Sequence, residues 1–256
     1  MLENETLAAL RRRRSVRAFQ ERPVEEAVKE ALLDAALQAP TAGCQMLYTV
    51  IDVTDQSEKQ ALSELCDHQD FIARAPVVLI FLADCRRWYD AFEQAGCAPR
   101  APGAGDLLLA AADACIAAQN VVVAAESLGL GSCYIGDILE NCAQVRQLLE
   151  LPAHVVPAAM LVLGYPAPGQ MEREKPARFS RRFIVQENRY RTAEPGEFQR
   201  EQQARSPERS LCREDYRAWM DAFCRRKYNS AFSREMTRSA TEYLQEFLAD
   251  APEGRR

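Results

Sequence analysis

The sequence predicts a fold in which helices and strands alternate, of the α+β or α/β class. Two observations carry this prediction. A continuous apolar run, Val77–Ala83, follows a proline and has the length and composition of a strand that is buried on both faces. The longest helical stretch, Asp106–Leu128, is apolar on almost every face, which predicts a core helix about 34 Å long. Helical and strand patterns alternate around these two elements up to residue 165.

The remaining elements of this region are predicted from local signals. Pro23 precedes two glutamates, which the dipole at the start of a helix favours. Pro157 precedes an apolar run of strand length. The expected helices are Glu3–Arg12, Val24–Gln38, Gln56–Cys66, Arg86–Gln94 and Cys142–Leu149, and the other expected strands are Leu47–Val53, Ser132–Ile135 and Ala158–Tyr165.

Two loops of this region have compositions that suggest a function. Pro40–Gln45 is small and polar, and Gln45 at the entrance of a strand could pair with a planar heterocycle because its amide both donates and accepts hydrogen bonds. The ordinary alternative is that Gln45 satisfies the loop backbone. Gly96–Gly105 is rich in Gly, Pro and Ala, and loops of this kind often cover a site.

The end of the core helix has two interpretations. Gly129 and Gly131 follow it, and a short strand then leads directly to Gly136. These glycines are typical of an ordinary helix end with a glycine C-cap. Alternatively, the helix feeds a strand whose end contacts a cofactor.

Composition limits the class of protein. A chain of 256 residues with 48% hydrophobic and 27% charged residues is expected to fold into one or two globular domains. A net charge of -5 and a pI near 5.3 argue against general nucleic-acid binding. No signal peptide is expected. The core helix is the one candidate membrane span, but its Asp113, Gln119, Asn120 and Glu126 favour burial in protein over burial in lipid.

Nine cysteines are scattered along the chain without a CxxC pair, and only two histidines are present. The odd number and the apolar neighbours predict reduced, mostly packed thiols in a cytoplasmic protein. No zinc site is expected.

Six arginines lie between Arg11 and Arg22, the only dense basic cluster near the N-terminus. A solvated face, a nucleic-acid patch and a pocket for a small phosphate-bearing ligand are the three alternatives. Ser15, between Arg14 and Arg17, favours the phosphate pocket, because a hydroxyl and guanidinium groups together suit phosphate oxygens.

The composition changes from about Pro195, and the chain is therefore divided into predicted domains 1–190 and 191–256. Aromatic residues in the second part recur at spacings of three and four, which predicts helices. These helices are expected to pack on the body or on a second subunit.

Common catalytic motifs are absent from the sequence. GLGSCYIG lacks the spacing and context of a dinucleotide-binding fingerprint, and neither GxxxxGK[ST], HExxH nor GxSxG occurs. An enzyme with so few histidines is expected to rely on a bound organic cofactor.

Four separated segments resemble the FMN-dependent nitroreductase family in order and spacing, and most closely its branch of NADPH-linked nitro/flavin reductases. They are RRSVR (Arg13–Arg17), APTAGCQML (Ala39–Leu47), GLGSCYIG (Gly129–Gly136) and GYP…KPAR (Gly164–Arg178). The resemblance implies an α/β/α sandwich of the α+β class with a mixed, mainly antiparallel sheet. It also implies an interlocked homodimer with FMN at the interface, and a helical C-terminal extension.

The resemblance also implies the cofactor-binding residues. Arg13, Ser15, Lys175 and Arg178 would hold the phosphate, and Arg17 would lie at the pyrimidine edge of the flavin. Gly136 would let the backbone approach flavin N5, because it has no side chain. The complete set of expected contacts is Arg13, Arg14, Ser15, Arg17, Thr41, Gln45, Met46, Leu47, Tyr134, Ile135, Gly136, Lys175 and Arg178.

Two positions depart from the family pattern. Ala177 separates Pro176 from Arg178, where the family branch usually has Lys-Pro-Arg, which puts the role of Arg178 in question. Asp137 stands where a second glycine often follows, and its charge could shift the potential of the flavin.

The implied function is an FMN-dependent NAD(P)H oxidoreductase that reduces nitroaromatics, quinones or flavins by a ping-pong route, with hydride passing through flavin N5 and no side-chain nucleophile. The alternatives are a reductase with one narrow substrate, such as a flavin, an enone or a halogenated aromatic, and a flavin-binding sensor or storage protein without turnover. Neither the choice between NADPH and NADH nor the physiological acceptor follows from the sequence.

Overall fold

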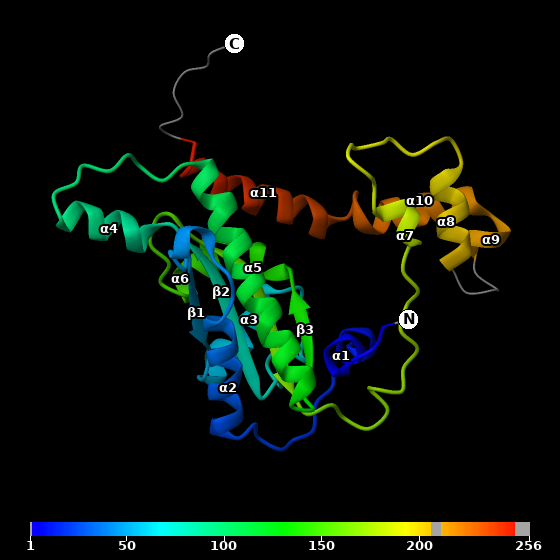
Figure 1. Cartoon of the computed structure of the whole chain (residues 1–256), viewed down its shortest axis with the longest axis horizontal. Coiled ribbons are helices and arrows are strands. Elements are labelled where there is room, and N and C mark those ends of the chain that lie inside the picture. Colours follow the sequence, from blue (N-terminus) through cyan, green and yellow to red (C-terminus); the bar gives the residue numbers. More distant parts are fainter. Residues whose placement is uncertain (1, 206–210, 249–256) are drawn as a thin grey trace, which may run out of the picture. The chain divides into compact units, whose positions relative to one another are not determined.

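The computed structural model describes residues 2–205 and 211–248 (Figure 1). It divides into two compact units, of which the first contains residues up to 172 together with those from 235 onward, and the second contains residues 173–234. Each unit is described by itself. The predicted domain boundary at residue 190 stays a prediction.

The first unit contains every helix and strand predicted up to residue 165, with ends that shift by a few residues. Its helices are α1 (Glu5–Arg12), α2 (Glu26–Leu37), α3 (Gln56–Leu65), α4 (Arg86–Gln94), α5 (Ala104–Ser127) and α6 (Cys142–Leu148), with 3-10 turns η1 (Ala42–Cys44) and η2 (Asp137–Leu139). Its strands are β1 (Tyr48–Asp52), β2 (Val77–Asp84), β3 (Gly131–Ile135) and β4 (Val155–Gly164).

The four strands form one sheet in the order β1-β2-β4-β3, and neighbouring strands are antiparallel. The N-terminal segment adds a parallel bridge between Ser15 and Ser132, and an antiparallel bridge joins Phe19 to Pro166. The expectation of a mainly antiparallel sheet is therefore confirmed, and the parallel pairing is an isolated bridge outside the named strands.

Helices cover both faces of this sheet, as the side chains of β2 show. All eight residues of β2 are buried. Leu79 and Phe81 pack into a cluster with α2 and α5, whereas Val78 and Ile80 point to the opposite face and pack with α3 and α6. Figure 1 shows α2 and α5 lying together against one side of the sheet. The predicted α/β/α sandwich and the doubly buried central strand are confirmed.

Strand β4 begins three residues before the predicted Ala158, at Val155. Pro157 was expected to precede the strand but lies inside it, although proline cannot donate a ladder hydrogen bond. The register shifts at this point, where Leu82 of β2 pairs with Pro157 and Phe81 pairs with Ala159. A bulge therefore accommodates the proline inside the strand.

Helix α5 is not buried on every face, which corrects the expectation from its composition. Its inner face packs on the sheet and α2, but Leu108, Leu109 and Ile116 are 73%, 52% and 40% exposed. By length and composition alone the helix could span a membrane. Its packed inner face and the buried Asp113 make it a core helix whose outer stripe is left uncovered in a single chain.

The N-terminal segment lies on β3 because Gly131 has no side chain. A Cβ built at Gly131 would lie 2.5 Å from Cγ2 of the fully buried Val16. The backbone N–H of Val16 donates to the Ser132 carbonyl at 3.0 Å. Close approach at Gly131 thus brings the arginine-rich segment to the edge of the sheet.

Replacing Gly131 by Ala is expected to destabilise the protein by about 2 kcal/mol, because the added methyl group overlaps the Val16 side chain and overpacked cores cost about 1 to 3 kcal/mol. Urea unfolding of G131A would measure the change. Gly105→Ala is the control, since a Cβ there meets nothing within 4 Å. Equal stability of both variants would contradict the close approach.

The chain returns to the first unit through α11 (Ala231–Gln245). Glu235 accepts a hydrogen bond from the backbone N–H of Asn141 at 3.2 Å, and Ser239 accepts one from that of Cys142 at 3.0 Å. These side chains satisfy N–H groups at the start of α6. Tyr243 and Phe247 are buried in the body, as expected for part of the C-terminal region.

The second unit contains α7 (Arg181–Ile184), α8 (Glu197–Arg205), α9 (Leu211–Glu214) and α10 (Tyr216–Lys227). Tyr216, Trp219 and Phe223 of α10 stack along one face of the helix, with ring centroids 6.3 and 5.1 Å apart. The helical spacing of these aromatic residues is thus confirmed.

Candidate functional site

The predicted cofactor contacts of the first unit fall into two groups. The first, called here the β3-edge group, consists of Arg13, Arg14, Ser15, Arg17 and Tyr134–Gly136. The Cys133 thiol lies inside it. Burial raises the pKa of this thiol, while the Arg17 charge, contact with the Ser15 hydroxyl and the Arg13 charge act in the opposite direction. The structure thus brings the predicted RRSVR motif and the end of β3 together.

Two guanidinium nitrogens in the β3-edge group have no hydrogen-bond partner among the described residues. They are Nη1 of Arg13 and Nε of Arg14, and both atoms are buried. A buried donor without a partner costs about 1 to 3 kcal/mol, and more when it is charged, so these atoms are favourable positions for a bound water, ion or ligand. Neighbouring Arg12, in contrast, is paired with Glu126 at 2.8 Å. The two orphaned donors fit an anion such as the phosphate of FMN.

Gly136 at the end of β3 also fits a ligand. Its φ of -80° is accessible to any residue, so the backbone does not require glycine here. A Cβ would meet no atom within 4 Å, and the space beside the backbone is therefore free. A flat ring could approach this backbone only because the side chain is absent.

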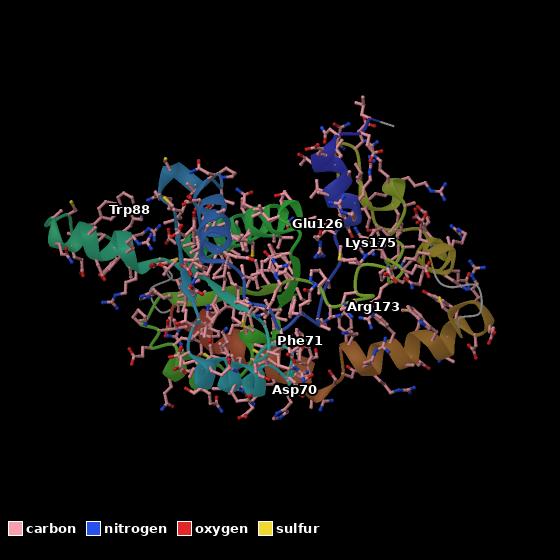
Figure 2. All side chains as sticks on the ribbon, turned by 90° about the horizontal axis from the view of Figure 1, so that it is seen from below. Asp70, Phe71, Trp88, Glu126, Arg173 and Lys175 are labelled. Carbon is pink, nitrogen blue, oxygen red and sulfur yellow. The ribbon has the colours of Figure 1, made fainter. Side chains whose placement is uncertain are left out.

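Two aromatic side chains border the β3-edge group. Tyr134 donates to Gln119 of α5 at 3.4 Å, and burial raises the pKa of its hydroxyl to about 12, so it stays protonated at neutral pH. Phe71, which follows α3, lies with its ring 6.0 Å from the Arg17 guanidinium (Figure 2). No local pattern marks Phe71 as a site residue, because its contact with Arg17 is made only in the fold.

The second group, called here the loop group, consists of Thr41, Gln45, Met46 and Leu47 before β1. Asp113 of α5, only 3% exposed, holds this loop. Its carboxylate accepts hydrogen bonds from the Thr41 hydroxyl, from the Ala42 N–H at 3.0 Å and from the Leu47 N–H at 3.2 Å. The Thr41 hydroxyl in turn accepts the Met46 N–H at 2.8 Å.

These hydrogen bonds hold a loop with unusual backbone geometry. Gly43, Cys44 and Met46 have φ values of 55°, 58° and 52°, in the left-handed region that residues other than glycine seldom adopt. Such a conformation persists only where the surroundings determine it. Sequence reasoning missed the role of Asp113, although an acidic residue in the middle of an apolar helix required a buried partner.

The two groups lie at opposite edges of the sheet. Tyr48, at the start of β1, pairs with Ala83 of β2. Ile135, at the end of β3, is level with Ile80 of β2, so the two residues lie on the two outer strands and are also offset along them. Three strand spacings separate these strands, about 14 Å. Figure 2 shows Trp88, which contacts Gln45, and Glu126, which contacts Arg12, in different parts of the first unit. The β3-edge group and the loop group thus lie at the two outer strands of the sheet in one chain.

Lys175 and Arg178 belong to the second unit, so their predicted contact with the phosphate stays a prediction. The Arg178 guanidinium donates to the Pro176 carbonyl at 3.4 Å, across the additional Ala177.

Glu140 is an acidic residue beyond Gly136 that sequence reasoning did not select. It is 4% exposed, and burial, together with the charges of Asp137, Asp67 and Glu235, raises its pKa from 4.5 to about 7. Between pH 4.5 and 7 this carboxyl is therefore mostly protonated in the folded state and mostly ionised in the unfolded chain.

This shift predicts a loss of stability as the pH rises. Between pH 4.5 and 7 the folded state binds more protons than the unfolded chain, so the free energy of unfolding falls, by about 2 to 3 kcal/mol in total. Glu140→Gln is expected to remove this loss. The free energy of unfolding of the variant, relative to that of the unmodified protein, is therefore expected to be higher at pH 8 than at pH 5. Urea unfolding at both pH values measures the difference, with Glu64→Gln as the exposed control. A pH-independent effect of E140Q would contradict the prediction.

Comparison with known proteins agrees with this geometry. The family model described as the nitroreductase family matches residues 10–165. An oxygen-insensitive NADPH nitroreductase of Salmonella typhimurium is 35% identical over 185 residues, which cover 72% of this chain and 74% of that protein. An FMN reductase of Bacillus subtilis that uses NAD(P)H is 37% identical over 166 residues, which cover 64% of this chain and 67% of that protein.

A solved structure extends the similarity beyond the matched region. The NADPH:FMN oxidoreductase of Vibrio harveyi, complexed with NAD+, superposes with a TM-score of 0.75 and is 26% identical in sequence. The superposition covers 97% of this chain and 100% of that chain. The matched family model spans more than half of the present chain, and its residues include the whole β3-edge group and the loop group. This chain belongs to the nitroreductase family.

Proposed function

We propose that this chain, an FMN-dependent NAD(P)H oxidoreductase, works as a cytoplasmic homodimer that reduces nitroaromatics, quinones or flavins by a ping-pong route. The observation that carries the proposal is the pair of orphaned guanidinium nitrogens of Arg13 and Arg14 in the segment that bridges to β3, the strand that ends at the open backbone of Gly136. The names of the Salmonella, Bacillus and Vibrio relatives support the reaction class.

The side chains of the β3-edge group have distinct tasks in this proposal. Arg13, Arg14 and Ser15, together with Lys175 and Arg178, would bind the phosphate. FMN, when bound, would supply the redox chemistry by accepting hydride from NAD(P)H at N5 and donating it to the acceptor. Arg17 would stabilise negative charge at the pyrimidine edge. Residues Gln45 to Leu47 would position the ring.

Two observations support a homodimer with FMN at the interface. The β3-edge group and the loop group lie at opposite edges of the sheet in one chain, and a second copy that supplies one of them would bring both groups to one flavin. The outer face of α5 is an apolar stripe with positions three and four apart, which is the pattern of a helix that packs on a partner. The stripe contains Leu108, Leu109, Ala112, Cys115 and Ile116, all exposed, and it ends at the polar Gln119.

Leu108→Asp is expected to weaken the dimer at least about 100-fold, because an unpaired carboxylate in an apolar interface costs several kcal/mol. Sedimentation velocity across a concentration series measures the effect. Leu37→Asp is the matched control, since Leu37 is an exposed leucine at the end of α2 and lies outside the stripe. Dimers of unchanged stability in L108D would place the interface elsewhere.

The reaction class is tested by the absorption spectrum of the purified, FMN-loaded protein. Addition of NADPH or NADH without oxygen is expected to bleach the flavin band, and an acceptor such as 1,4-dinitrobenzene is expected to restore it. A flavin band that NAD(P)H does not bleach would favour a sensor or storage protein. If only one class of acceptor restores the flavin band after bleaching, the result would favour a reductase of narrow specificity.

A further inference from the structure

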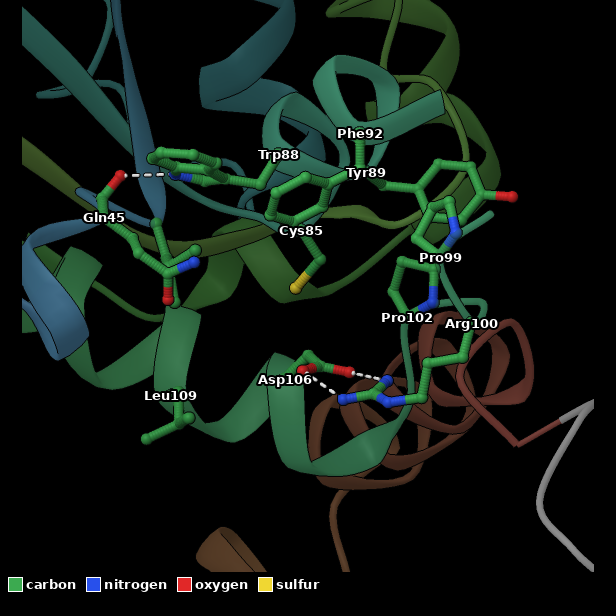
Figure 3. Close-up of a pocket in the computed structure, with 11 residues that line it drawn as sticks. Gln45, Cys85, Trp88, Tyr89, Phe92, Pro99, Arg100, Pro102, Asp106 and Leu109 are labelled. Atoms are coloured by element: carbon green, nitrogen blue, oxygen red, sulfur yellow. Dashed lines mark hydrogen bonds and ion pairs between the residues drawn. The ribbon is translucent and has the colours of Figure 1, made fainter. Parts of the chain in front are cut away.

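A cleft lies beside the loop group, between α4 and the start of α5. We call it the α4 cleft and define it by Gln45, Trp88, Phe92, Pro99, Pro102 and Leu109 (Figure 3). Helix α4 forms one wall, and the predicted Gly96–Gly105 loop and the start of α5 form the other. Its volume is about 270 Å³, near the lower end of the range for small-molecule sites.

The walls of the α4 cleft are aromatic and held in place. The rings of Trp88 and Phe92 lie 5.6 Å apart and are 37% and 39% exposed, so each presents a free surface. The Trp88 indole N–H donates to the Gln45 carbonyl at 2.8 Å, which fixes the orientation of the ring. A fixed, electron-rich indole is a favourable stacking partner for an electron-poor planar ring.

The charged groups in the cleft are already neutralised. Arg100 forms an ion pair with Asp106 through two contacts of 2.5 and 2.9 Å. Burial raises the pKa of the Cys85 thiol to about 12, so it carries no charge at neutral pH. A charged ligand would find no free counter-ion among these groups. The cleft therefore suits an uncharged ring.

The cleft is continuous with the residues predicted to contact the flavin. Gln45 and Leu47 line it and also belong to the loop group. The Gln45 side-chain amide has no hydrogen bond to other described residues, so it can bond to a polar substituent of a bound ring. We propose that the α4 cleft binds the ring of an uncharged, electron-poor aromatic acceptor by stacking on Trp88. This proposal rests on the proposed oxidoreductase function.

Binding is tested directly by tryptophan fluorescence, because the chain has only two tryptophans. In the Trp219→Phe variant all tryptophan emission comes from Trp88. Saturable quenching by 1,4-dinitrobenzene is expected in W219F, whereas the matched Trp88→Phe variant, which keeps only Trp219, should show linear collisional quenching. The charged analogue 3,5-dinitrobenzoate is expected to bind at least about 5-fold more weakly. These measurements need no turnover, so they test the cleft even if the protein proves not to be a reductase.

Kinetics then separate the acceptor from the nicotinamide. Trp88→Ala is expected to raise the KM for 1,4-dinitrobenzene about 10-fold and to leave the rate of flavin bleaching by NADPH unchanged. W88F keeps an aromatic ring and is expected to recover most of the loss. General destabilisation of the protein would reduce the rate of flavin bleaching as well as raise the acceptor KM. A change in the acceptor KM alone therefore indicates a role of Trp88 in acceptor binding.

Three results would overturn the proposal. The first is identical quenching of Trp88 and Trp219, and the second is an unchanged acceptor KM in W88A with normal bleaching. The third is saturable quenching of Trp88 only in the monomeric L108D background, which would show that a second copy fills the cleft. Failure of NADPH to bleach the flavin in the W219F protein would instead count against the proposed function.

Discussion

Replacing Asp113 by Ala is expected to lower the free energy of unfolding by about 3 to 5 kcal/mol, because three hydrogen-bond donors lose their acceptor. The substitution leaves the N–H groups of Ala42 and Leu47 and the Thr41 hydroxyl without their acceptor. Each unsatisfied buried donor costs about 1 to 3 kcal/mol. Part of this cost is relieved if the loop opens to water, and the loop would then lose its left-handed conformation.

Asp113→Asn gives the sharper comparison. It keeps the shape but only one accepting oxygen, so a loss of about 1 to 2 kcal/mol is expected. Urea unfolding of the apo-protein measures both variants, and FMN titration reports whether the loop group contributes to binding. Glu126→Gln is a matched control on the same helix, because Glu126 pairs with one exposed arginine. A loss below about 1 kcal/mol in D113A would show that Asp113 does not hold the loop.

Replacing Arg13 by Ala is expected to weaken FMN binding about 100-fold. A charge-assisted hydrogen bond contributes about 1.5 to 3 kcal/mol, and loss of one such bond to a partly buried phosphate accounts for an effect of this size. Flavin fluorescence titration of the apo-protein gives the dissociation constant. The orphaned Nη1 of Arg13 is the atom that would make the contact.

Riboflavin separates phosphate binding from damage to the fold, since it has the same ring and no phosphate. R13A is expected to bind riboflavin as the unmodified protein does. Arg12→Ala is the control variant, because its guanidinium is already paired with Glu126 and exposed. Equal weakening for FMN and riboflavin, or an equal effect of R12A, would remove Arg13 from the phosphate site.

Local patterns predicted most of the fold. The apolar run of β2, the acidic start of α2 and the helical pattern of α4 each depend on near neighbours in the chain, and each element was found where it was expected. Pro157 was misplaced because the bulge that accommodates it depends on the register against β2, a partner far away in the sequence. The β3-edge group was predicted by its resemblance to a family motif, and the fold brought its members together.

The sequence by itself determined the order of helices and strands, the family, and the residue types that suit a flavin phosphate. It could do so because propensity, periodicity and motifs are properties of neighbouring residues. Only the tertiary structure decided that Asp113 holds the loop group and that α5 leaves an apolar stripe uncovered. It also placed β1 and β3 at opposite edges of the sheet. These features follow from strand pairing and from the face that each helix buries, which depend on contacts between residues far apart in the chain.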